Sequence, residues 1–126
     1  MTNFRKNILI VDNNKVLLDV LRLALANVEF QVITAGSLAE AKSAVANQSF
    51  DLVVTELHFN RGDKTDGFDL LAAVTRKSPH TRVIVMTARG TPELEREAYE
   101  RGAYLFLNKP FNLHLLEIQL EKLGFN

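Results

Sequence analysis

The chain has 126 residues, with 15 Lys and Arg against 15 Asp and Glu, so its formal net charge is zero, and it contains no cysteine. This length and a 47% hydrophobic, 24% charged composition are typical of one globular domain, which we expect to span residues 1–126. The lack of cysteine excludes disulfides, thiolate metal sites and cysteine nucleophiles. Zero net charge gives no general attraction to nucleic acid or to a membrane surface. With no apolar run near the ~20 residues of a membrane span and no room for a signal peptide, we expect a cytoplasmic protein without direct nucleic-acid or membrane binding.

The first part of the chain predicts two strand–helix units. Residues 8–11 are a short, β-branched apolar run, typical of a strand buried on both faces. The polar residues 12–14 suit a turn and a helix N-cap. Apolar residues then recur at helical spacing, at Val16, Leu17, Val20, Leu21, Ala24 and Val28. Residues 30–35 predict a second strand, and Ser37 with Glu40 match a capping box that begins a second helix.

Three more units follow. Further strands are predicted at residues 51–56, 82–87 and 104–107. The helices between and after them are marked by Phe68, Leu70, Leu71 and Val74, by Thr91 and Pro92, and by Leu113, Leu116, Leu120 and Leu123. Pro79 closes the first of these helices, Gly102 ends the second and Gly124 ends the last. This alternation predicts an α/β fold, (βα)₅, with a doubly wound parallel five-stranded sheet.

Polar residues lie at the carboxyl ends of four predicted strands, where parallel sheets bind their ligands. They are Asp12 and Asn13, Glu56, Thr87 and Lys109. We therefore expect acids, a hydroxyl and an ammonium group to converge on one edge of the sheet.

The chain resembles, over essentially its whole length, the receiver domain of bacterial two-component response regulators. The residues that carry the resemblance are ILIVD (8–12), DLVVT (51–55), DGFDLL (66–71), VIVMTA (83–88), GA (102–103) and KPF (109–111). The resemblance implies a flavodoxin-like topology with strand order 2-1-3-4-5. It also implies phosphoryl transfer from a phosphohistidine to an aspartate after the third strand, with Mg²⁺ alongside. The implied partners are a sensor histidine kinase, a phosphotransfer protein or an output domain, and a second copy that pairs through the fourth helix, fifth strand and fifth helix.

Several residues match the family's site. Thr87 matches the switch hydroxyl, and Lys109 matches the lysine, followed by Pro110 in what is usually a cis peptide. Phe106 matches the switch aromatic, although an apolar residue there equally suits the core. Asp12 matches the first of the acidic pair that binds the metal.

Other positions depart from the family. Glu56 stands at the phosphoacceptor position, and its extra methylene, roughly 1.5 Å of bond length, moves the oxygens from where an aspartate would aim them. A misplacement of about 1 Å can cost on the order of a hundredfold in rate. Asn13 offers a neutral oxygen where the family has a carboxylate. The usual Met-Pro is replaced by His58 and Phe59, and the loop to Gly67 is longer than usual.

These departures predict a degenerate phosphorylation site. We expect no enzymatic activity, no required cofactor and only weak Mg²⁺ binding at Asp12, Asn13 and Glu56, with action by phosphorylation-independent protein–protein interaction. The alternative is a weakly phosphorylatable, Mg²⁺-dependent receiver. A flavodoxin-like cofactor binder is disfavoured, because residues 11–15 lack a hydroxyl- and glycine-rich phosphate loop.

Two interpretations of Glu56 remain open. Its carboxylate either extends toward Lys109 and Thr87 and imitates an acyl phosphate, or it pairs with Lys109 only to neutralise a buried charge. Both predict Glu56 and Lys109 within ion-pair distance. The three histidines, His58, His80 and His114, have no metal-ligand spacing, and we expect them to be solvated.

Overall fold

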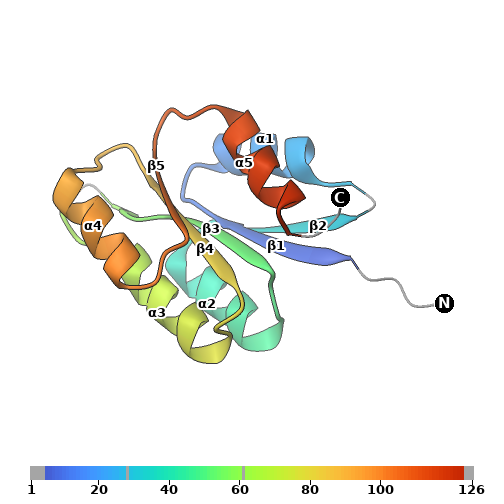
Figure 1. Ribbon diagram of the computed structural model, residues 1–126, viewed down its shortest axis with the longest axis horizontal. Coiled ribbons are helices and arrows are strands. Elements are labelled where there is room, and N and C mark those ends of the chain that lie inside the picture. Colours follow the sequence, from blue (N-terminus) through green and yellow to red (C-terminus); the bar gives the residue numbers. More distant parts are fainter. Residues whose placement is uncertain (1–4, 28, 61, 124–126) are drawn as a thin grey trace.

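The computed structural model describes residues 5–27, 29–60 and 62–123, so the predicted helix residues Val28 and Gly124 lie outside the described part. Within that part, strands and helices alternate along the chain (Figure 1). The strands are β1 (Lys6–Val11), β2 (Phe30–Ala35), β3 (Leu52–Glu56), β4 (Arg82–Thr87) and β5 (Leu105–Asn108). The helices are α1 (Lys15–Leu25), α2 (Leu38–Asn47), α3 (Gly67–Lys77), α4 (Pro92–Glu100) and α5 (Leu113–Glu121).

The strands form one parallel sheet in the order β2-β1-β3-β4-β5, which confirms the predicted fold class and strand order. Val11 pairs with Thr55 in β3, and Glu56 pairs with Met86 in β4. Because all strands run the same way, the residues that follow β1, β3, β4 and β5 meet at one edge.

Alternating side chains of the strands form two core layers. Leu9 and Val53 pack beneath α2, α3 and α4, whereas Ile8 and Val54 pack beneath α1 and α5. Figure 1 shows these helix groups on opposite faces of the sheet. Residues 8–11 of β1 and residues 52–54 of β3 are therefore all apolar, as a strand buried on both faces requires.

Side chains cap four helices at their N-termini. The side-chain oxygens of Asn14, Ser37, Thr91 and Asn112 accept hydrogen bonds from backbone N–H groups in the first turns of α1, α2, α4 and α5. The Glu40 carboxylate binds the N–H of Gly36, one residue earlier than a capping box would place it.

The buried face of α1 differs from the predicted apolar stripe. Leu18, Leu21 and Leu25 are buried, whereas Val16 and Val20 are 72% and 52% exposed. Only three residues of α1 are charged, so apolar side chains surround most of the helix. Periodicity alone therefore could not select the buried face.

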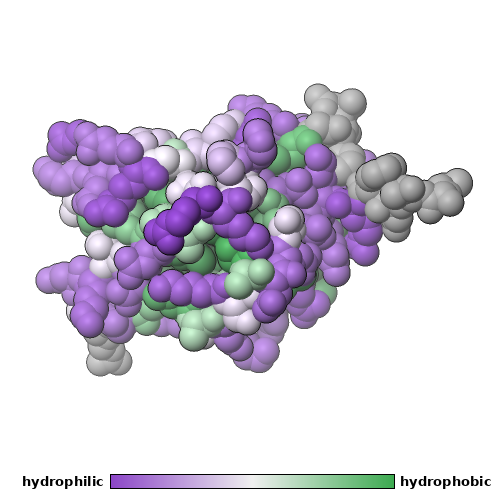
Figure 2. All heavy atoms as spheres, turned by 90° about the horizontal axis from the view of Figure 1, so that it is seen from below, coloured by the Kyte–Doolittle hydropathy of each residue, from purple (hydrophilic) through white to green (hydrophobic). Residues whose placement is uncertain are grey.

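The outer face of α2, α3 and α4 is mainly hydrophilic, with smaller hydrophobic areas between the charged side chains (Figure 2). In the described part of the chain, no helix has the length and apolar character that crossing a membrane requires.

Candidate functional site

Three charged side chains meet at the carboxyl edge of the sheet. Lys109 Nζ lies 2.5 Å from Asp12 Oδ2 and 2.7 Å from Glu56 Oε1, so the ion pair expected between Glu56 and Lys109 is present. Asp12 is 1% exposed and Glu56 is 6% exposed. Burial lowers the pKa of Lys109, but hydrogen bonds and charge attraction from both carboxylates outweigh it and raise the pKa above its usual 10.5. The ammonium group is therefore charged at neutral pH.

The sheet topology brings these groups together. Asp12 directly follows β1 and Glu56 ends the neighbouring strand β3. Lys109 follows the edge strand β5, and its backbone N–H donates to the carbonyl of Thr87, 2.9 Å away. The Lys109–Pro110 peptide bond is cis, as the resemblance implies.

The remaining carboxylate oxygens bind backbone amides. Glu56 Oε2 accepts from the N–H groups of Leu57 and His58, at 2.8 and 2.9 Å. Asp12 Oδ1 accepts from the N–H of Asn14 at 2.8 Å. Every oxygen of the two carboxylates thus already accepts a hydrogen bond from the protein.

The side chain of Thr87 is hydrogen-bonded to the ring of His58. Its Oγ1 lies 3.0 Å from His58 Nδ1 and accepts from the N–H of Arg89 at 3.1 Å. The expectation that His58 is solvated is wrong, because the loop after β3 turns the half-buried ring toward the end of β4. His80 and His114 are exposed, as expected.

The environment of His58 favours its neutral form. Burial lowers its pKa, and the positive charge of Arg89 lowers it further, against smaller opposite effects of Glu56 and Asp63. A neutral ring can accept from the Thr87 hydroxyl, which already accepts the Arg89 amide. We therefore assign the ring proton to Nε2.

Asn13 lies at the same edge but acts as a donor. Its Nδ2 donates to the carbonyl of Phe59 at 2.6 Å. Arg89, in the loop after β4, donates to the carbonyl of Asn60 in the same loop after β3, at 2.7 Å. These two contacts and the His58–Thr87 contact hold the loop after β3 to the loops after β1 and β4. Asn14, rather than Asp12 or Asn13, provides the N-cap of α1.

The residues that match the family's metal site do not fit a divalent ion in this arrangement. Mg²⁺ requires oxygen ligands at about 2.1 Å in near-octahedral geometry. Here the nearest carboxylate oxygens of Asp12 and Glu56 share the Lys109 ammonium group, and Asn13 presents its nitrogen to Phe59. Among the described residues, no group of three or more His, Cys, Asp or Glu side chains could hold a metal ion.

Phe106 lies in the core layer beneath α2, α3 and α4 and is 5% exposed. A Cβ atom on Gly90 would lie 2.9 Å from its ring, so the loop after β4 packs directly on the aromatic side chain. Its backbone N–H donates to the Tyr99 hydroxyl of α4 at 3.1 Å. The position is compatible with both predicted roles, core residue and switch.

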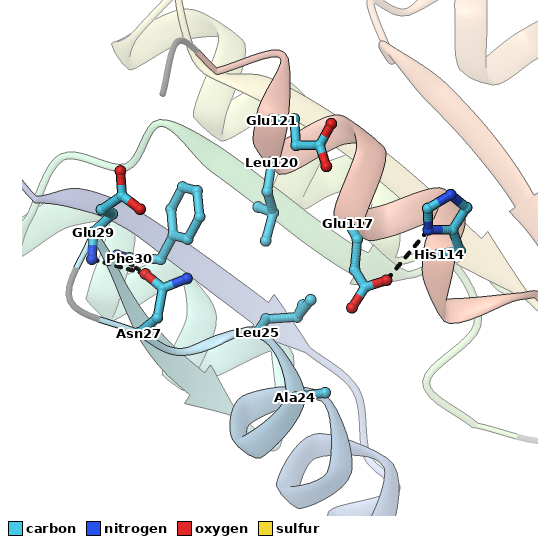
Figure 3. Close-up of a pocket in the computed structure, with 9 residues that line it drawn as sticks. All are labelled: Ala24, Leu25, Asn27, Glu29, Phe30, His114, Glu117, Leu120 and Glu121. Atoms are coloured by element: carbon cyan, nitrogen blue, oxygen red, sulfur yellow. Dashed lines mark hydrogen bonds and ion pairs between the residues drawn. The ribbon is translucent and has the colours of Figure 1, made fainter. Parts of the chain in front are cut away.

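Among the cavities that border α1, two were not indicated by the sequence. An apolar groove of about 410 Å³ lies beside Lys109, between α1 and the loop after β5, where Leu17, Val20 and Phe111 face it. A second cavity of about 390 Å³ lies between the end of α1, the start of β2 and α5 (Figure 3). Its lining includes the carboxylates Glu29, Glu117 and Glu121, and His114 contacts Glu117 at 3.4 Å. Since both cavities form between segments far apart in sequence, neither could be predicted.

Comparison with known proteins gives consistent matches. The sequence model described as the response regulator receiver domain matches residues 8–121. The transcriptional regulatory protein GlrR of Escherichia coli K12 is 34% identical over 110 residues, which are 87% of this chain and 24% of that protein. The chain spans about a quarter of the length of the curated relatives it matches.

Solved structures show the same fold. The receiver domain protein (CheY-like) from Methanospirillum hungatei JF-1 has a TM-score of 0.83 at 28% identity, covering 94% of both chains. A response regulator protein from Burkholderia pseudomallei, solved with a phosphorylated aspartic acid, a calcium ion and citrate, has a TM-score of 0.79 at 26% identity. That match covers 93% of this chain and 72% of the other.

Proposed function

The chain belongs to the response regulator receiver domain family, and on this premise we propose that it is a receiver module of two-component signalling with a degenerate phosphorylation site. It acts through protein–protein contacts that do not depend on phosphorylation. It catalyses no reaction of its own and requires no cofactor.

The observation that carries this proposal is the engagement of the Glu56 carboxylate. One oxygen binds the Lys109 ammonium group, and the other accepts two backbone N–H groups. A nucleophilic carboxylate needs a free oxygen in line with the phosphorus atom of the donor. The buried and fully hydrogen-bonded carboxylate of Glu56 offers no such oxygen without first breaking these contacts.

The same contacts favour neutralisation over imitation of an acyl phosphate. Imitation requires the carboxylate to engage both Lys109 and Thr87. The hydroxyl of Thr87 is engaged by His58 and Arg89, and Glu56 binds Lys109 and the backbone. A carboxylate also has less charge and fewer oxygens than a phosphoryl group. We propose that Glu56 compensates a buried lysine and holds no active-like state.

The proposed partners are a sensor histidine kinase, a phosphotransfer protein or an output domain, in the cytoplasm. Since the matched relatives are about four times longer, any output domain attached to this chain is itself a proposal. The surface of α4, β5 and α5 carries three exposed large apolar residues, Tyr99, Tyr104 and Leu115, and we propose it as the contact for a second copy. The chain makes no direct contact with nucleic acid in this proposal.

Intact mass after incubation with Mg²⁺ and a small phosphodonor such as acetyl phosphate tests the degenerate site. We expect the wild type to remain unmodified and Glu56→Asp to gain one phosphoryl group, because the shorter side chain retracts from Lys109 and from the backbone amides. Glu117→Asp, on exposed α5, is the matched control and should behave as the wild type. A phosphorylated wild type would establish the weakly phosphorylatable, Mg²⁺-dependent receiver instead.

A further inference from the structure

The helix α4 is tied to the rest of the molecule by polar contacts at both of its ends. We propose that the hydrogen bond from the Phe106 N–H to the Tyr99 hydroxyl is a latch, which fixes the end of α4 on β5, and that its loss releases α4 as one unit. The inference deepens the proposed function, on which it rests, because it names what holds the surface of α4, β5 and α5 in one arrangement without a phosphoryl group.

Apolar burial alone anchors α4 weakly. All nine residues of α4 are described, and Ala98 is the one among them that is buried. Leu94 is partly buried and packs against the core layer beneath the helix. By contrast, five of the eleven residues of α3 are buried. An element with few buried apolar side chains opens locally at a low cost in free energy. Single hydrogen bonds therefore contribute a large share of what keeps α4 in place.

The start of α4 is tied through the loop after β4. The backbone N–H of Arg89 donates to the Thr87 hydroxyl, and the guanidinium group of Arg89 donates to the carbonyl of Asn60. Gly90 packs so closely on Phe106 that a Cβ atom there would lie 2.9 Å from the ring. These contacts fix where α4 begins, but they do not reach its last turn.

Tyr99 ties the last turn of α4 to an edge strand. Its hydroxyl accepts the N–H of Phe106 at 3.1 Å. The strand β5 lies at the edge of the sheet and pairs with β4, and the Lys109 N–H that follows it donates toward β4. The Phe106 N–H is therefore used outside the ladder, where no described strand could accept it. Removal of the hydroxyl would leave this N–H without an acceptor in the described part of the chain.

A second tyrosine on the same surface provides a matched control. The side chain of Tyr99 is 42% exposed and that of Tyr104 is 39% exposed. The Tyr104 ring contacts the guanidinium group of Arg82, which lies 4.5 Å from the ring centroid. Among the described residues, the Tyr104 hydroxyl has no hydrogen-bond partner. Tyr104→Phe thus removes the same atom as Tyr99→Phe without removing a tie to α4.

Both ties of α4 end on the residues that match the family's switch pair. Thr87 is hydrogen-bonded to His58 and to the Arg89 N–H, and Phe106 is hydrogen-bonded to Tyr99. The chain therefore supplies these partners from its own residues. The surface of α4, β5 and α5 is accordingly formed before any covalent change at the carboxyl edge of the sheet.

Hydrogen exchange of the backbone amides, followed by NMR in EDTA and without a phosphodonor, tests the inference. In Tyr99→Phe we expect the amides of residues 96–100 to exchange faster by a common factor of about five, as the loss of one hydrogen bond of ordinary strength from a local opening equilibrium predicts. The Phe106 amide should accelerate at least as much. The amides of α2 and α3 should keep their wild-type rates, and Tyr104→Phe should match the wild type throughout.

Four results would overturn the inference. They are a faster Phe106 amide with unchanged α4 amides, an equal acceleration across α2, α3 and α4, unchanged rates throughout Tyr99→Phe, and an effect of Tyr104→Phe as large as that of Tyr99→Phe. The first would reduce the contact to a local hydrogen bond, and the second would mean a loss of global stability.

The outcome is separable from the phosphodonor experiment. A wild type that accepts a phosphoryl group would overturn the proposed function but would not alter exchange rates measured on the unphosphorylated protein. A failed exchange prediction would remove the latch and leave the degenerate site standing.

Discussion

At the scale of single residues, the site is organised by hydrogen-bond donors around two buried carboxylates. Lys109 and three backbone amides satisfy Asp12 and Glu56. A charge buried without partners is costly, so these contacts compensate the burial of both acids. The residues that could perform phosphoryl chemistry are thus used to stabilise one another.

The pKa of His58 provides a test of the contacts around Thr87. Burial and the charge of Arg89 place this pKa below 6.5, so His58 should stay neutral at pH 7. A histidine with a lowered pKa in the folded state stabilises the fold above its unfolded value, near 6.5, and this contribution is lost as pH falls through the folded value. NMR titration of the His58 ring should show a midpoint below 6.5.

Arg89→Gln should raise this midpoint, whereas Arg89→Lys, which keeps the charge, should change it less. Arg96→Gln, on exposed α4, is the control and should leave it unchanged. A midpoint at or above 6.5 in the wild type would contradict the proposed neutral ring.

The sequence alone predicts which residues stand at the edge of the sheet but not all their contacts. Strand ends are visible in the apolar periodicity, so the pattern is sufficient to place Asp12, Glu56 and Thr87 together. The contact between His58 and Thr87 depends on how the loop after β3 turns. Loop direction leaves no periodic signal, and for this reason the pattern wrongly indicates a solvated His58.

At the scale of elements, strands are easier to predict than helix faces. The predicted bounds of β2 and β4 agree with the structure, because short apolar runs between polar turns define them. In α1, the apolar side chains surround the helix and the buried face is chosen by packing against β1, β2 and α5. Tertiary packing therefore determines which face of α1 is buried, and the apolar periodicity of the sequence could not predict that face.

Two leucines of α1 test this assignment of faces. Leu21 is 3% exposed and Leu23 is 73% exposed. We expect Leu21→Ala to lower the free energy of unfolding by about 2–5 kcal/mol, because it leaves a cavity beneath the helix. Leu23→Ala should change it by less than about 0.5 kcal/mol. Urea unfolding measures both. Equal losses would contradict this assignment of faces, and a larger loss for Leu23→Ala would mean that the opposite face of α1 is buried.

At the scale of the whole molecule, the large apolar side chains that are exposed in the described part of the chain occur on two surfaces. Val16, Val20 and Leu23 project from α1, whereas Tyr99, Tyr104 and Leu115 belong to the surface of α4, β5 and α5. The zero net charge adds no long-range repulsion between copies. Apolar contact, with little dependence on salt, is therefore the expected basis of association.

Self-association distinguishes these two surfaces. Sedimentation velocity over a range of protein concentrations should show a monomer–dimer equilibrium for the wild type. Leu115→Glu should shift it toward monomer, because a charge at the centre of a surface that two copies bury is desolvated without a partner. Val20→Glu places the same charge on α1 and should leave the equilibrium unchanged. The reverse pattern would assign the contact to α1, and a monomer at every concentration would exclude pairing of this chain through either surface.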